Sequence, residues 1–325
     1  MIIENQKNYC FQEAEQVFFR PTFCGKSIEE MGVRVIYNLP VPTIAYLFSQ
    51  QNGVLKAFSS GWQGGEACVK EQVEISMNKV KAESAYSAEE YFNTVFELVT
   101  SSADVNIGDL TGTDLEKAET ELFRRAIAEG IYSTMWLGDI CESVSSLTTF
   151  NGFFRHLYDS FVILGEESRV KFLDDDIGLA ATDYLSNAWC GASHALRALV
   201  AEGQLAYYVS SDLYDAYQRE LDNKLGGGYN EMQVGRPRLY YHGIPIIEVP
   251  LAKYQPQMAK TFCLLTDRRN LVLAINTKDT PENEVRMWYN PDEMENRQRA
   301  VFLAGTAIID QDLVSGMVLN VEGSF

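Results

Sequence analysis

The feature of this sequence that most limits its fold is a long stretch of β-forming residues interrupted by a glycine-rich loop. β-forming residues dominate positions 32–50 (GVRVIYNLPVPTIAYLFSQ), where Pro40 and Pro42 exclude a helix. Positions 52–67 (NGVLKAFSSGWQGGEA) are rich in glycine and serine and predict a hairpin loop. Apolar and polar residues then alternate over 69–78, which is typical of a half-exposed strand. Together these segments predict one extended β-arm, which can bury little of itself.

Helices and shorter strands follow the arm. Residues 113–130 have the strongest helical pattern, with a capping box from Thr113 to Glu116 and Gly130 as the expected end. Residues 174–203 predict a second long helix with one apolar side. The remaining predicted elements are a helix at 87–99, a buried strand at 205–209, a serine-capped helix at 210–221, a hairpin at 236–250, strands at 261–266 and 270–276, a polar stretch, and an apolar segment at 299–310. This order indicates an α+β fold.

Composition and charge exclude several functional classes. At 325 residues the chain is too long for one ordinary domain, and 46% hydrophobic residues suffice for sizeable cores. A net charge of −18 argues against binding nucleic acid through clustered lysine and arginine. No apolar run approaches the roughly 18–20 residues of a membrane span, so no membrane partner is expected. The first residues lack the basic and apolar regions of a signal peptide, which predicts synthesis in the cytoplasm.

The cysteines do not have the spacing of a metal or redox site. No two are closer than 14 positions, which excludes a CxxC motif. In a chain without an export signal they predict six reduced thiols, and we expect no cofactor and no metal. These cysteines are Cys10, Cys24, Cys68, Cys141, Cys190 and Cys263.

Other candidate chemical sites are weak. Cys190 and His194 lie four positions apart on one predicted helix and could touch, but no third catalytic group is indicated. Residues 20–27 (RPTFCGKS) place Lys26 in the Gly-Lys-Ser that ends a phosphate loop, but the required first glycine is absent, which argues against nucleotide binding. The three carboxylates at 174–176 precede a helix and favour capping over metal binding. His242 flanks a hairpin turn, where we interpret it as a turn residue.

Several segments, in this order along the chain, resemble the major capsid protein of tailed bacteriophages, which has the Hong Kong 97-type fold. Each segment resembles one part of that fold: the strand leaving the extended loop, the spine helix, the segment after the spine, the strand and helix of the axial domain, its Gly-Ile-Pro hairpin, and the return into the peripheral domain. These are residues 66–93, 113–130, 148–159, 203–221, 236–250 and 261–310.

The resemblance implies an organisation into four parts. These would be an N-terminal arm at 1–33, an extended β-hairpin loop at 34–82, a peripheral domain with the spine helix at 83–137 and 265–325, and an axial domain at 138–264. It also implies contacts between subunits at the tip of the extended loop and in the axial loop. The candidate contact residues are Lys56, Trp62, Gly226, Gly227, Gly228 and Tyr229.

The function implied by the resemblance is structural and not enzymatic. Copies of such a chain would assemble into pentamers and hexamers of an icosahedral virion shell around double-stranded DNA. Separate scaffolding, portal and maturation proteins would be its other partners. An encapsulin-type nanocompartment shell, which resembles the same fold, remains an alternative. A cytosolic hydrolase that uses Cys190 and His194 is a third interpretation.

Overall fold

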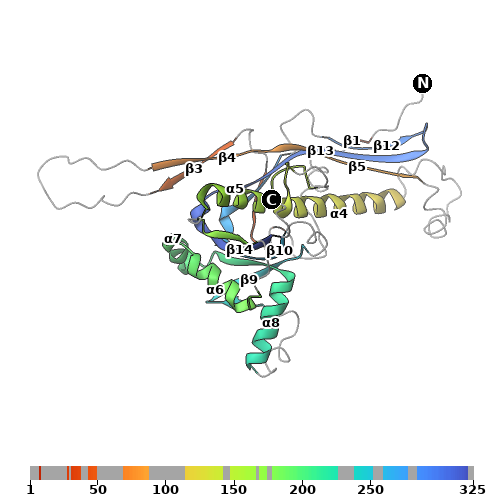
Figure 1. Ribbon diagram of the computed structural model, residues 1–325. Coiled ribbons are helices and arrows are strands. Elements are labelled where there is room, and N and C mark those ends of the chain that lie inside the picture. Colours follow the sequence, from red (N-terminus) through yellow and green to blue (C-terminus); the bar gives the residue numbers. More distant parts are fainter. Residues whose placement is uncertain are drawn as a thin grey trace, which may run out of the picture.

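The computed structural model contains two six-stranded sheets, five α-helices of five or more residues and a projecting two-stranded ribbon (Figure 1). These elements are counted over the residues that the structure describes, which are 7–8, 28, 31–37, 43–49, 69–87, 114–141, 147–165, 168–173, 178–225, 238–251, 259–276 and 284–320. Helices and strands both contribute to the cores, so the predicted α+β class is confirmed.

The first sheet is built around β13, which is 14 residues long (Glu295–Ile308). One edge of β13 pairs antiparallel with β5, and the other pairs first with β12 and then with β11. The even-numbered residues of β13 face the core, so Ala300, Phe302 and Ala304 are buried. The other strands are β1 (Lys7–Asn8), β2 (Arg34–Tyr37), β5 (Asn78–Ser87), β11 (Leu271–Asn276) and β12 (Glu284–Asn290).

The second sheet is buried on both faces at its centre. All six residues of β7 (Leu205–Ser210) are buried, which confirms the predicted buried strand. Ala206 and Tyr208 belong to the core shared with the first sheet, whereas Tyr207 and Val209 belong to the core beneath the helices. The order is β6-β14-β10-β7-β9-β8. The other strands are β6 (Val170–Leu173), β8 (Tyr240–Tyr241), β9 (Ile244–Val249), β10 (Ala259–Asp267) and β14 (Val314–Asn320).

The long helix α4 (Asp114–Leu137) continues past Gly130, so the predicted end at this glycine is wrong. Every residue from 131 to 137 is buried, and this burial outweighs the roughly 1 kcal/mol that a glycine costs inside a helix. Trp136 is the centre of this packing, because its ring contacts those of Phe153, Tyr208 and Phe262. The last turn of α4 thereby joins the helix to the second sheet.

The single helix predicted for 174–203 is also wrong, because the described part of this segment contains two short helices and a 3-10 turn. Ala192 has the extended backbone angles φ −62° and ψ 139°, which end the first helix. Ser193 caps the next helix by accepting a hydrogen bond from the Leu196 N–H, and Arg197 donates to the carbonyl of Cys190 at 2.8 Å. The elements are α6 (Ala181–Gly191), α7 (His194–Ala198) and η2 (Leu199–Glu202). α6 and α8 (Ser211–Leu225) cover the second sheet.

The predicted hairpin at 236–250 is confirmed as β8 and β9, joined by a two-residue turn. His242 (φ 51°) and Gly243 (φ 76°) both have positive φ, which is the conformation of a type I′ turn. The ring of His242 stacks on that of Trp189 at 5.3 Å, so the turn also packs against α6. His242 is therefore a turn residue, as expected.

The sequence patterns did not predict β1, β6, β12 or β14, and the residues of β12 were interpreted as a polar stretch. Met287 is buried, whereas Arg286, Trp288 and Tyr289 are half-buried. The available signal for β12 was its content of valine and aromatic residues, which favour strands.

Two glycine substitutions are expected to change stability in opposite directions. Gly243→Ala should lower the free energy of unfolding by about 1 kcal/mol, because an L-residue is strained at positive φ. Gly130→Ala should raise it by about 0.5–1 kcal/mol, because alanine favours the helix and the added methyl group meets nothing within 4 Å. Urea unfolding of both variants measures the two changes, and changes of the same sign would contradict this account.

Candidate functional site

The sequence-predicted contact residues lie outside the described part of the chain. This applies to Lys56, Trp62, Gly226, Gly227, Gly228 and Tyr229. Their roles therefore stay predictions. The structure does describe the elements that flank them in sequence. β3 ends at Ser49, β4 begins at Val69, and α8 ends at Leu225.

The ribbon formed by β3 (Thr43–Ser49) and β4 (Val69–Ile75) projects from the body of the protein (Figure 1). The two strands pair antiparallel from Thr43 opposite Ile75 to Ser49 opposite Val69, and the described residues add no third strand. This confirms the pairing expected of the extended arm. A two-stranded ribbon alone is marginally stable in water, so its stability depends on other surfaces.

The base of the ribbon is fixed by a small core. Ile75 and Met77 are buried there against Val272, Ala274 and Ala307 of the first sheet. Gly305 permits this close approach, because a Cβ atom at this position would lie 2.1 Å from the Ser76 carbonyl oxygen. The ribbon therefore leaves the body in a defined direction.

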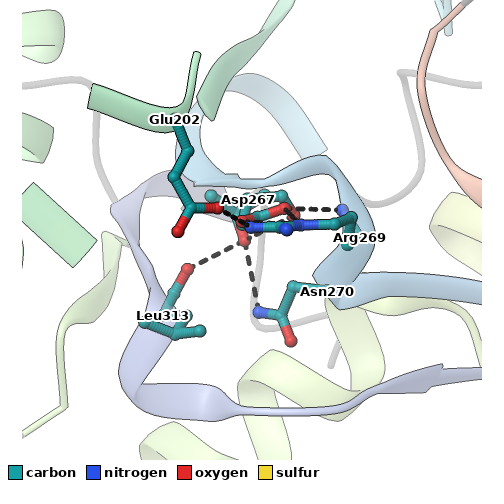
Figure 2. A network of polar contacts seen from close by, with 6 residues as sticks. Glu202, Asp267, Arg269, Asn270 and Leu313 are labelled. Carbon is teal, nitrogen blue, oxygen red and sulfur yellow. Dashed lines mark hydrogen bonds and ion pairs between the residues drawn. The ribbon is translucent and has the colours of Figure 1, made fainter. Parts of the chain in front are cut away.

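Two connections cross between the sheets at one junction. β10 leads to β11 through η3 (Arg268–Asn270), and β13 leads to β14 through η4 (Gln311–Leu313). The buried Asn270 side chain joins these connections, since its Nδ2 donates to the Asp310 carbonyl and its Oδ1 accepts from the Asp310 N–H, both at 2.7 Å. The Thr266 hydroxyl donates to the Leu313 carbonyl at 2.8 Å (Figure 2).

A buried carboxylate orders the shorter turn of the junction. Asp267 accepts from the backbone N–H of Arg269 at 2.8 Å and from its guanidinium Nη2 at 2.6 Å. Arg269 also pairs with Glu202 at 2.7 Å, which ties η2 to the junction (Figure 2). Both side chains of that pair are about half exposed, so solvent screens it and it adds little stability. The role of Asp267 is geometric, because it fixes the turn that starts β11.

A second close crossing joins α4 to α5 (Phe153–Leu164). Gly138 and Gly152 let the two backbones touch, with the Gly152 N–H donating to the Gly138 carbonyl at 2.7 Å. The buried carboxylate of Asp139 pairs with Arg155 at 2.9 Å. His156 then connects α5 to β13, since its Nε2 lies 3.1 Å from the Thr306 carbonyl oxygen. Burial lowers the pKa of His156 below its ordinary value, although the bond to Thr306 opposes this shift.

The hydrolase interpretation loses its geometric basis. It required Cys190 and His194 to share one face of a continuous helix, but α6 ends at Gly191 and α7 begins at His194. Cys190, His194 and Cys141 are exposed, and Cys141 and Cys190 are free thiols. Cys263 is fully buried, and this burial raises the pKa of its thiol because the charged thiolate would lose its water. Cys263 is therefore unsuited to nucleophilic chemistry.

Neither a metal-binding cluster nor a membrane-spanning helix is present in the described ranges. There, no group of three or more His, Cys, Asp or Glu side chains is placed to hold a metal ion. The carboxylates at 174–176 and Lys26 fall outside these ranges. None of the described helices is both long and apolar enough to cross a membrane.

The hydrogen bonds of Asn270 at the junction predict that removing its side chain lowers the stability of the protein substantially. Asn270→Ala should lower the free energy of unfolding by about 2–3 kcal/mol, because it leaves the N–H and carbonyl of Asp310 without these partners. The matched control is Asn187→Ala, at an exposed position of α6, which should change stability by less than about 0.5 kcal/mol. Chemical denaturation distinguishes them, and equal effects would contradict the role of the junction.

His156 predicts a loss of stability at acidic pH. An unfolded histidine binds a proton near pH 6.5, whereas the buried imidazole resists protonation. Below that pH the unfolded state binds more protons, so the free energy of unfolding falls as the pH falls from 7 to 5. His156→Gln, which can still donate to Thr306, should flatten this dependence, and His194→Gln should not. An unchanged slope in His156→Gln would contradict this assignment.

Comparison with known proteins finds a similarity of fold and no match to a known family by sequence. No family model matches the sequence, and no curated protein does. A chain of the satellite phage P4 procapsid that includes the size determination (Sid) protein has a TM-score of 0.55 at 8% identity, covering 95% of this chain and 98% of that one. The capsid of an empty GTA particle gives 0.53 at 12% identity, covering 94% and 92%. The native GTA particle capsid gives 0.52 at 11%, covering 94% and 93%. The chain therefore has the Hong Kong 97-type fold of phage capsid shells, as the sequence resemblance predicted.

Proposed function

We propose that this chain is the major capsid protein of a tailed phage or prophage. In this proposal it assembles into the pentamers and hexamers of an icosahedral shell that encloses double-stranded DNA. It would be made in the bacterial cytoplasm and act in the virion without enzymatic activity. Separate scaffolding, portal and maturation proteins would assist assembly.

The likeness to a procapsid chain over nearly the full length of both chains carries the proposal. The match includes the body with its two sheets and is not confined to one common motif, because it covers 95% of this chain. A likeness of this extent favours a shell subunit over a protein that shares a single domain with one.

The β3–β4 ribbon supports a role in assembly. Its strands lack a third partner among the described residues and would gain one on a neighbouring subunit. We propose that Lys56 and Trp62, in the segment joining β3 to β4, contact that neighbour. Gly226, Gly227, Gly228 and Tyr229 follow α8 and would contact other subunits around the capsomer axis.

We propose that the two sheets mark the peripheral and the axial domain. α4 and the first sheet would form the peripheral domain, and β7 with α6 and α8 would form the axial domain. β14 pairs with β10 and β6, so we propose that it packs with the axial domain although it follows the peripheral strands in sequence. The net charge of −18 suits a wall that repels packed phosphate.

The test is to express the full chain, separate it by size-exclusion chromatography and image each fraction by negative-stain microscopy. We expect closed shells, or rings of five or six subunits. Nuclease-protected DNA in particles from a host with the complete prophage would support DNA enclosure. Particles that contain a protein cargo and no DNA would instead favour a nanocompartment. A chain that stays monomeric even in that host would contradict the proposal.

A further inference from the structure

Strand β5 leaves one edge of the first sheet open. Along all of its 10 residues (Asn78–Ser87) it pairs with β13 on one side, and no other strand among the described residues pairs with it on the other side (Figure 1). An open edge presents a row of backbone N–H and C=O groups that can pair with a further strand. Natural proteins keep such edges short or protect them, so an open edge of this length calls for a partner or a barrier.

A groove with a volume of about 520 Å³ follows this edge. Its lining includes five consecutive residues of β5, from Val80 to Ser84. Successive side chains of a strand point to opposite faces, so a hollow on one face would be lined by alternate residues only. Lining by consecutive residues places the hollow beside the edge itself. The other wall consists of residues of α4, which include Leu122, Phe123 and Ala126.

The helix α4 leaves the edge of β5 accessible. It contacts β13, and its Thr120 hydroxyl lies 3.5 Å from the sulfur of Met287 on β12. The helix therefore lies over β12 and β13, and β13 separates β12 from β5. Lys81, Glu83 and Ser84 of β5 are exposed, so solvent reaches the edge beside them.

The charges on the edge are arranged symmetrically about Ala82. Lys81 precedes this residue and Glu83 follows it. In an antiparallel pair of two β5 strands with Ala82 opposite Ala82, Lys81 of each copy lies opposite Glu83 of the other, and Val80 lies opposite Ser84. Opposite charges directly across two strands stabilise the pairing, whereas like charges disfavour it. The edge is therefore complementary to a second copy of itself.

The same charges disfavour the neighbouring arrangements. An antiparallel pair centred on Lys81 would place Lys81 opposite Lys81, and a pair centred on Glu83 would place Glu83 opposite Glu83. A shift by a single residue would leave both charges opposite uncharged residues, and a parallel pair in register would place every charge opposite a like charge. Edge charges that oppose these pairings and permit one of them provide selectivity for it.

We propose that β5 pairs antiparallel with β5 of a second copy, across a twofold axis at Ala82. The first sheets of the two copies then form one continuous sheet, and both α4 helices lie on the same face of it, because residues directly opposite in an antiparallel pair share a face. A strand seated beside the edge also covers Leu122, which is 55% exposed in the single chain.

The symmetry of this contact gives its place in the assembly, a step that rests on the proposed shell function. A twofold contact is isologous, since both copies use the same surface, whereas the subunits within a ring of five or six meet head to tail. The β5–β5 contact would therefore join subunits of two neighbouring rings.

The ion pair within one chain does not prevent the contact. Lys81 Nζ lies 2.8 Å from Glu83 Oε2 of the same strand, and the two side chains are 59% and 49% exposed. Solvent screens an exposed pair of this kind, so exchanging it for two pairs between copies costs little. The backbone hydrogen bonds of the joined edges supply the affinity, and the charges determine the register.

Charge reversal tests the contact. Lys81→Glu places two carboxylates on each edge and Glu83→Lys places two ammonium groups there, so each variant alone should need an about tenfold higher protein concentration for half-maximal assembly. An equal mixture of the two variants should restore assembly, because an acidic edge then meets a basic one. The mixture cannot restore the ion pair within a chain, so this rescue identifies a contact between copies. The melting temperature of each single variant should stay near that of the unaltered chain, because both side chains are exposed.

Disulfide cross-linking gives an independent readout of the register. Chains with Ala82→Cys, half of them labelled with ¹⁵N, are mixed, mildly oxidised and digested. Peptide mass spectrometry should find position 82 of labelled chains joined to position 82 of unlabelled chains. Ser84→Cys is the matched control on the same strand, because the two copies of position 84 would lie four residues apart, about 13 Å, which is too far for a disulfide.

The outcomes distinguish this contact from the proposed function. Shells that form normally from both charge variants, or that give no link at position 82, would overturn the contact and leave the shell function standing. A mixture that assembles no better than either variant alone, or equal links at positions 82 and 84, would also overturn it. A link confined to position 82 upholds the contact even where the chain forms pairs and no closed shell, in which case the shell proposal alone fails.

Discussion

The polar junction between the two sheets is the constraint on which the rest of the structure depends. Each sheet receives one strand from each crossing connection, so the sheets cannot shift independently once the connections are joined. Asn270 and Thr266 join them by hydrogen bonds to the backbone of Asp310 and Leu313. These groups are buried or partly buried, and breaking the bonds would leave polar atoms without partners in an environment where this is costly. The angle between the sheets is thereby fixed, and Trp136 packs where α4 meets the second sheet.

Because the body of the protein is rigid, the surfaces that its cores leave uncovered have fixed positions relative to one another. The stability of the chain resides in its cores, whereas the β3–β4 ribbon has only two strands and buries little of itself. Copies that each carry a net charge of −18 repel one another at a distance, but physiological salt screens this repulsion beyond about 8–10 Å. In the proposed shell, association would then depend on short-range contacts at surfaces that the rigid body positions.

Elements whose signals are local could be predicted from the sequence. Elements whose ends depend on packing against residues distant in the chain could not. The β8–β9 hairpin could be predicted because glycine at a two-residue turn favours one backbone conformation. The end of α4 could not, because the buried rings around Trp136 come from residues far along the chain. The break between α6 and α7 is stabilised by Arg197, whose bond to the Cys190 carbonyl no helical periodicity reveals. The exposure of Val162, Ile163 and Leu164 at the end of α5 could not be predicted for the same reason, since exposure of an apolar residue is known only once the fold is known.

The likeness of fold at 8% identity shows which constraints a chain of this fold must satisfy. Both faces of β7 must be apolar, because alternate residues of the strand pack into two different cores. Many different apolar residues can nevertheless fill such positions. Gly305 must lack a side chain because the Ser76 carbonyl lies against it, which constrains a single position. Requirements of this kind specify size, polarity and backbone freedom and rarely a particular residue. A family model built on residue preferences can therefore fail where a comparison of backbones succeeds.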